Sequence, residues 1–342
     1  MTVATVVAAA LFVGVVAYAL LAGADFGSGF YDLTAGSSSR GAALRTLVDH
    51  SIGPVWEANH VWLIYVLVMW WTAFPATFTV TMSTLIIPLL LALLGIVLRG
   101  AGFAFRKYSA TLGQARLFGA AFAGSSVLTP FFLGAAAGAV TSGRIPASGR
   151  GDLWSSWLNP TSLLSGTIAI TTCAFLAGTF LTADATRSGQ RDLAEQLRVR
   201  TLVVGTVTGV LVLIAIVPIT RDAPTLGEGL TGRAAPLILA SAVSGTATLV
   251  LLARRRPGLA RFTAAAAVAA VVTGWGVAQY PWLLVDEVTI AEAAGAPATL
   301  RALLVAVALA GIIVLPALGY LLRLTQTEAW SGHAGPRTGD LD

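Results

Sequence analysis

The sequence predicts an all-α integral membrane protein, and three observations lead to this class. Hydrophobic residues make up 56% of the 342 residues and charged residues only 11%, a composition typical of membrane proteins. Several stretches without Asp, Glu, Lys or Arg are as long as the roughly 20 residues that a helix needs to cross a bilayer. The alternating pattern in segments of about ten residues that marks a transmembrane barrel is absent.

Charge-free stretches define the predicted helices. They cover residues 3–24, 58–98, 117–143, 153–183, 201–220, 234–253, 262–285 and 302–322. The second stretch is too long for one span, so we expect it to turn at residues 70–75, where Pro75 lacks an amide donor and disfavours helix at Phe74. The chain is therefore predicted to have nine transmembrane helices.

The distribution of basic residues predicts the orientation. With nine helices, sixteen of the 21 Lys and Arg residues fall on the face that also holds the C-terminus. Because Lys and Arg accumulate in cytoplasmic loops, the N-terminus is expected outside and the C-terminus in the cytoplasm. This topology also explains the net charge of +5, with anionic lipid headgroups as sufficient partners and no nucleic acid.

The chain is expected to form one transmembrane domain over residues 1–323, followed by a cytoplasmic polar tail over 324–342. A short Leu-Ala-Gly sequence occurs at residues 21–23 and again at 176–178. It suggests two related four-helix bundles, residues 1–141 and 153–280, with a last helix at 301–323. Aromatic residues at the predicted outer helix ends suggest an interfacial belt: Trp70, Trp71, Trp154, Trp157, Tyr280 and Trp282.

The second predicted helix carries a carboxylate into the bilayer. Residues 58–71 are too few to span it, so the helix must begin upstream and include Glu57. A charged intramembrane carboxylate costs roughly 2.5 kcal/mol or more and is a functional-site hypothesis by default. His60 shares its face one turn along; proton relay, metal ligation and a hydrogen-bonded core role are its alternatives, the last being the commonest. Trp56 and Asn59 form a second such pair, and Asn59 is expected to hydrogen bond across a helix interface.

Asp25 ends the first predicted helix at the same depth as Glu57. Two carboxylates at matched depth suggest a route for proton uptake from the cytoplasm, because burial favours the protonated form and brings exchange toward physiological pH. An interfacial Asp25 that contacts water or a headgroup is the equal alternative. Arg99 ends the third helix and is expected to snorkel to the cytoplasmic headgroups; pairing with Asp25 or Glu57 is the sharper alternative.

Other chemistries lack their motifs. A single cysteine, Cys173, rules out a disulfide or CxxC metal site within the chain, and packing is its expected role. No Walker sequence, no GxGxxG after a strand and no GxSxG nucleophile motif occur. No metal site is predicted.

Two segments resemble subunit II of the cytochrome bd quinol oxidases. They are Gly-Ala-Asp-Phe-Gly-Ser-Gly over residues 23–29 and Pro-Val-Trp-Glu-Ala-Asn-His-Val-Trp-Leu-Ile over 54–64, and residues 99–103, 158–160 and 274–281 extend the similarity. The resemblance implies a heterodimer in the bacterial cytoplasmic (inner) membrane. Its subunit I holds haem b and haem d, and the complex oxidises quinol and reduces oxygen to water. This chain is then expected to ligate no cofactor; contact with quinone and a small accessory subunit stay open.

The resemblance also implies roles for particular residues. Glu57, where many relatives have Asp, would lend its carboxylate to the cytoplasmic proton path, together with Asp25. Weaker candidates at a subunit or ligand interface are Trp56, Asn59, His60 and Arg99, and no role is transferred to His60. Two alternatives remain: a purely structural subunit of the same oxidase, and a proton-coupled transporter that acts alone.

Overall fold

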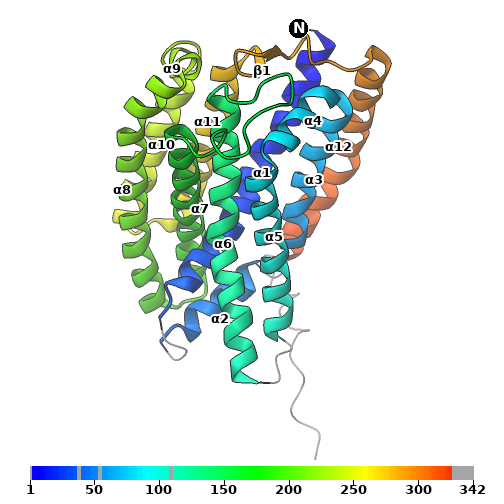
Figure 1. Cartoon of the computed structure of the whole chain (residues 1–342). Helices are drawn as coiled ribbons and strands as arrows, with labels where there is room; N and C mark the ends of the chain where they lie inside the picture. Colours follow the sequence, from blue (N-terminus) through cyan, green and yellow to red (C-terminus); the bar gives the residue numbers. More distant parts are fainter. Residues whose placement is uncertain (1, 37–39, 53–55, 108–110, 326–342) are drawn as a thin grey trace, which may run out of the picture.

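The computed structural model describes residues 2–36, 40–52, 56–107 and 111–325, and nearly all of this part is helical (Figure 1). Its long helices run side by side between two ends of the molecule, which confirms the all-α class. The predicted polar tail lies outside the described residues from 326 onward. The helices are α1 (Val3–Leu33), α2 (Ala42–Ile52), α3 (Trp56–Ala73), α4 (Pro75–Thr84), α5 (Ile86–Lys107), α6 (Leu112–Thr141), α7 (Pro160–Arg187), α8 (Arg191–Asp222), α9 (Pro224–Thr231), α10 (Ala235–Ala253), α11 (Pro257–Gln279) and α12 (Pro297–Thr325).

Eight helices of the described part are long and apolar enough to cross a membrane: α1, α5, α6, α7, α8, α10, α11 and α12. The predicted second span, α3, is not among these eight, so the count of nine spans stays a prediction. Several helices are longer than their charge-free stretches, with 31 residues in α1 and 32 in α8. At 1.5 Å per residue they extend well past a hydrocarbon core of about 30 Å, so charged residues at their ends remain helical.

The break predicted at Pro75 is present, but the chain does not enter the next span directly. Phe74 has φ −137° and ψ 60°, and Pro75 begins the short helix α4. A second irregular residue, Leu85, separates α4 from α5. Four threonines and one serine among the ten residues of α4 make it far less apolar than α5. In Figure 1, α4 lies toward the N-terminal end of the molecule and α5 runs away from it.

Two further helices and a short hairpin were not predicted. The helix α2 lies at the end of the molecule opposite the N-terminus, whereas α9 lies at the N-terminal end (Figure 1). Strands β1 (Trp282–Leu284) and β2 (Val288–Thr289) form an antiparallel hairpin beside α9, with Trp282 opposite Thr289. Each is too short to be seen in a pattern of long apolar runs.

The helix α1 is at the centre of the packing and contacts α3, α6, α7, α11 and α12. Its crossing with α7 is close because α1 presents glycines there. A Cβ on Gly27 would collide with the backbone carbonyl of Cys173, and one on Gly23 would lie 3.6 Å from both Leu176 Cδ2 and Cys173 Sγ. Small residues at such crossings let membrane helices approach. Asp25 is therefore held in a tightly packed part of the molecule.

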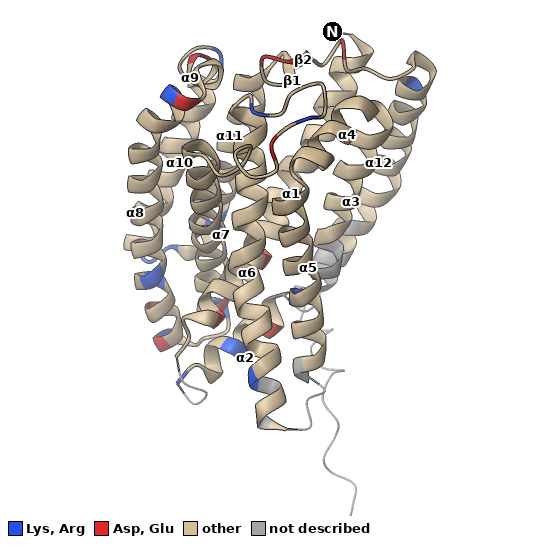
Figure 2. Ribbon diagram, in the orientation of Figure 1, with Lys and Arg blue, Asp and Glu red and all other residues tan. Residues whose placement is uncertain are grey.

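Charged residues gather near the two ends of the helices, and the region between is mostly uncharged (Figure 2). Of the predicted aromatic belt, Trp71 and Trp154 are exposed. Trp157 does not fit that prediction, since it is 5% exposed and packs on Phe132 at a ring-centroid distance of 5.7 Å. Its indole nitrogen donates to the carbonyl of Leu153, 3.0 Å away, so it belongs to the core.

Candidate functional site

A buried ion pair joins α1 to α5. Arg99 Nη2 lies 2.6 Å from Asp25 Oδ1, and each side chain is 2% exposed. Asp25 is interior because α1 continues about two turns past it, to Leu33. The interfacial interpretation of Asp25 and the snorkelling of Arg99 are therefore both wrong. The alternative, a pair between Arg99 and Asp25, is what the structure contains.

Residues of two helices, α1 and α6, hold the guanidinium of Arg99, which extends from α5. Its Nη2 also donates to the backbone carbonyl of Asp25 at 2.7 Å, and its Nη1 donates to Ser126 Oγ on α6. Ser126 Oγ in turn donates to the carbonyl of Phe122, 2.5 Å away. The guanidinium carbon lies 4.4 Å from the ring centroid of Phe122 and 5.2 Å from that of Phe26. Aromatic faces attract a cation within about 6 Å, so hydrogen bonds and rings together fix this side chain.

The Gly-Ala-Asp-Phe-Gly-Ser-Gly sequence has a geometric explanation. Gly29 faces α6, where an added Cβ would collide with Ser126 and lie 3.0 Å from Arg99 Nη1. Ser28 Oγ donates to the carbonyl of Asp25, 2.5 Å away. Phe26 supplies one of the rings beside Arg99. The segment thus combines a carboxylate, a ring and the space that Arg99 requires.

The pair leaves one oxygen of Asp25 without a partner. Its Oδ2 atom is buried and accepts no hydrogen bond from the rest of the described chain. Burying either charge alone would be far more costly than burying the two together. The site is therefore an electrically neutral unit that still offers a hydrogen-bond acceptor.

His60 approaches this site from α3. Its ring lies 6.1 Å from that of Phe26 and 6.4 Å from that of Tyr18, measured between centroids. Asn59 is 5% exposed, but its predicted hydrogen bond across a helix interface is not found within the described residues. Trp56 and Glu57 fall in the first turn of α3, and their side chains lie outside what the structure describes. Whether Glu57 faces Asp25 therefore stays a prediction.

Sequence reasoning missed Ser126, Phe122 and Tyr18. The signal for Ser126 was weak: it is half of a Ser-Ser pair inside a long apolar stretch, and Ser125 donates only to its own helix at Phe122. Metal binding finds no support in the described residues, where no three His, Cys, Asp or Glu side chains gather. Cys173 is a free thiol there.

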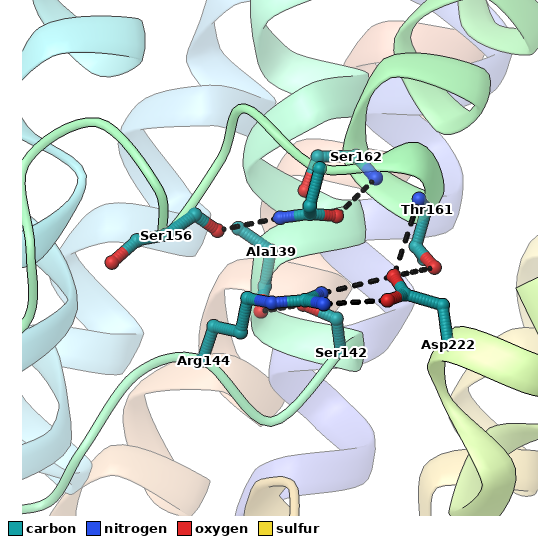
Figure 3. A network of polar contacts seen from close by, with 8 residues as sticks. Ala139, Ser142, Arg144, Ser156, Thr161, Ser162 and Asp222 are labelled. Carbon is teal, nitrogen blue, oxygen red and sulfur yellow. Dashed lines mark hydrogen bonds and ion pairs between the residues drawn. The ribbon is translucent and has the colours of Figure 1, made fainter.

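A second polar network lies at the N-terminal end of α7 (Figure 3). Arg144 donates to Asp222 through two nitrogens, at 2.5 and 2.9 Å, and Thr161 Oγ1 donates to the same carboxylate at 2.5 Å. The hydrogen bond to Asp222 raises the pKa of Arg144. Asn159 caps α7 by accepting from the Ser162 amide at 2.9 Å. This network joins α7, α8 and the loop after α6, which explains the Leu-Asn-Pro sequence at 158–160 structurally.

Fold and site together define a multi-pass helical membrane protein with an ion pair buried between its helices. The family described as cytochrome bd terminal oxidase subunit II matches residues 3–325, and the chain belongs to this family. The resemblance predicted from the motifs is confirmed. Family and apolar helices identify a multi-pass protein of the bacterial inner membrane.

The chain is also similar to two individual proteins. The chain is 32% identical over 129 residues to the cytochrome bd ubiquinol oxidase subunit 2 of Bacillus subtilis (strain 168), and this match covers 38% of the chain and 36% of that protein. It therefore spans only about a third of the relative's length. The bd oxidase structure from Geobacillus thermodenitrificans has a TM-score of 0.79 at 24% identity, over 95% of this chain and 99% of that one. This second likeness shows the fold.

Proposed function

We propose that the chain is the haem-free subunit II of a cytochrome bd-type quinol:oxygen oxidoreductase. The observation that carries this proposal is the family match over residues 3–325. In the complex, a subunit I partner holds haem b and haem d, which supply the site where oxygen is reduced to water, and quinol is the electron donor. Membrane lipids surround the complex, and quinone and a small accessory subunit are further candidate partners.

We also propose nine transmembrane spans, with α3 as the ninth, an outside N-terminus and a cytoplasmic C-terminus. The bias of Lys and Arg toward one face supports this orientation. The helices α1, α3, α5 and α6 form one four-helix bundle in this proposal, and α7, α8, α10 and α11 form the other. The two Leu-Ala-Gly sequences support the repeat, since Gly23 of the first lies against Leu176 of the second.

The proposed contribution of this chain to the chemistry is proton delivery through Asp25. Each electron that reduces oxygen has to be matched by a proton, and the bilayer interior offers no bulk water to supply it. Asp25 is buried in the half of α1 that leads to α2, and its unpartnered Oδ2 can accept a proton. The positive charge of Arg99 stabilises the ionised carboxylate, because its Nη2 donates to both Asp25 Oδ1 and the backbone carbonyl of Asp25. Glu57, on the first turn of α3, is the proposed residue before Asp25 on the route.

Replacement of the two carboxylates tests this role. In the purified two-subunit complex, Glu57→Gln and Asp25→Asn should each lower quinol-driven oxygen consumption by roughly tenfold or more, since a lost proton-transfer group typically costs at least that. The haem absorbance spectrum of Glu57→Gln should stay that of the unmodified complex. Asp25→Asn leaves Arg99 buried without its partner, so its turnover is compared per haem retained. Glu292→Gln is the matched control, because Glu292 is an exposed carboxylate that accepts from Thr289 beside β2.

The structural alternative makes a different prediction. If the chain is only a scaffold, Glu57→Gln should reduce haem retention and turnover in parallel. Unchanged turnover in both variants, with intact haem, would remove the proton-delivery proposal.

A further inference from the structure

Three buried polar atoms near the ion pair have no hydrogen-bond partner in the described chain. They are Asp25 Oδ2, His60 Nδ1 and Tyr18 Oη. An unsatisfied buried polar group costs about 1–3 kcal/mol, and lipid cannot offer a hydrogen bond in place of water. Three such groups in one region therefore call for a polar occupant.

The three side chains are arranged as a column along α1. Tyr18 and Asp25 are seven residues apart on this helix, so they share a face and are separated by about 10.5 Å along its axis. His60 enters from α3 between these two levels, since its ring lies near both Tyr18 and Phe26. The column leads from Asp25 toward the N-terminal half of α1.

The chemistry of the column suits water and protons. A phenol and a neutral imidazole each donate one hydrogen bond and accept another, and a carboxylate accepts. Buried waters typically bind two to four polar partners of this kind. Unpartnered hydroxyls also occur on Thr81 and Thr84 of α4 and on Thr129 of α6, but no described contact joins them to the ion pair, so they carry no comparable inference.

We propose that Asp25, His60 and Tyr18 hold a short row of water molecules and pass protons along α1 beyond the ion pair. This inference rests on the proposed role of Asp25. A proton bound at Asp25 Oδ2 moves through water to one ring nitrogen of His60 as the other ring nitrogen releases its own. Tyr18 Oη accepts the released proton through the next water while giving up its hydroxyl proton. One proton is then transferred and every side chain keeps its charge, but His60 is left in its other tautomer and the hydroxyl and waters point the opposite way. These groups must turn back before the next proton can pass.

The test compares two tyrosine variants in the purified oxidase complex. Tyr18→Phe should lower quinol-driven oxygen consumption about three- to tenfold and increase the ratio of rates in H₂O and D₂O, because proton transfer becomes limiting. His60→Phe should do the same. Tyr65→Phe is the control: Tyr65 lies on α3, and its hydroxyl already donates to the carbonyl of Ala10 at 3.0 Å. It should leave the rate and the isotope ratio unchanged.

The possible results separate this inference from the proposed function. Wild-type rates in Tyr18→Phe and His60→Phe, with a slow Asp25→Asn, would overturn the column and leave the role of Asp25 standing. A slow Tyr18→Phe with an unchanged isotope ratio would also overturn it, because a packing defect has that effect. A wild-type rate in Asp25→Asn would remove the proposed function itself. If His60→Phe fails to assemble with haem, the Tyr18→Phe comparison alone decides.

Discussion

Arg99 and Asp25 compensate one another in a place where neither charge would be stable alone. Removing one member of a buried ion pair typically costs about 3–5 kcal/mol, because the other charge stays buried without compensation. Arg99 also makes contacts that Lys cannot reproduce, since its planar group reaches Asp25 and Ser126 with different nitrogens. The pair is therefore best tested through both of its members.

For this ion pair we predict that a double variant regains stability without regaining turnover. Arg99→Met should lower the melting temperature of the complex strongly, and Asp25→Asn in the same chain should restore much of it, because no buried charge is left. Turnover should stay low in the double variant, since the carboxylate is gone. Fluorescence-detected melting and oxygen consumption measure the two quantities; a double variant no more stable than Arg99→Met would contradict the ion-pair argument.

The residue scale also shows where sequence reasoning ends. A carboxylate and a basic residue at membrane depth were predictable from length arithmetic and motif. Their pairing was only one of two alternatives, because Asp25 and Arg99 are 74 residues apart and the contact depends on the space left by Gly29. Ser126 completes the site from a third helix, and its apolar surroundings gave no indication of that role.

At the scale of elements, charge-free stretches located the helices but not their ends. Because helices of 28 to 32 residues exceed the bilayer thickness, α7 continues to Arg187 and α8 begins at Arg191, inside a segment expected to be a connection. The break at Pro75 followed from proline chemistry. The separate helix α4 did not, since its threonines carry no charge and so did not interrupt the stretch.

Asp222 joins α8 to α7 and to the loop after α6 by accepting hydrogen bonds from Thr161 and Arg144. Its replacement tests how much this contact stabilises the packing of these elements. Asp222→Asn removes the charge that both Arg144 nitrogens use, which should cost about 1–2 kcal/mol for a partly exposed site. Limited proteolysis in residues 142–159 should become faster, with the melting temperature of the complex lowered. Arg221→Gln, at the neighbouring exposed position, is the control, and equal effects of the two changes would refute the assigned role of Asp222.

For the whole molecule, burial differs sharply between helices. In their most apolar windows, 6% of the residues of α8 and α12 are buried, against 39% for α7. The outer helices therefore expose apolar faces that lipid or another membrane protein must cover, and α1 and α7 form the centre. Composition predicted this class of molecule, but not which helices are central, because the charge-free stretches alone do not distinguish inner from outer helices.

Affinity purification tests the assembly at this scale. Isolation of this chain from its native membrane in mild detergent should recover a second large hydrophobic chain and the absorbance bands of haem b and haem d. The haem signal should disappear when the partner is removed. A colourless chain recovered alone, and active in proton-coupled solute uptake after reconstitution, would instead support the transporter alternative.

The neutrality of the Asp25–Arg99 unit has a consequence for how the membrane voltage acts on the protein. A charge that crosses the whole membrane exchanges about 2.3 kcal/mol with a potential of 100 mV, but a paired anion and cation at one depth together exchange almost nothing. Once a proton binds Oδ2, the unit becomes a net cation, and the electric field does work on it in proportion to its depth. Voltage would therefore influence proton occupancy here without straining the resting protein.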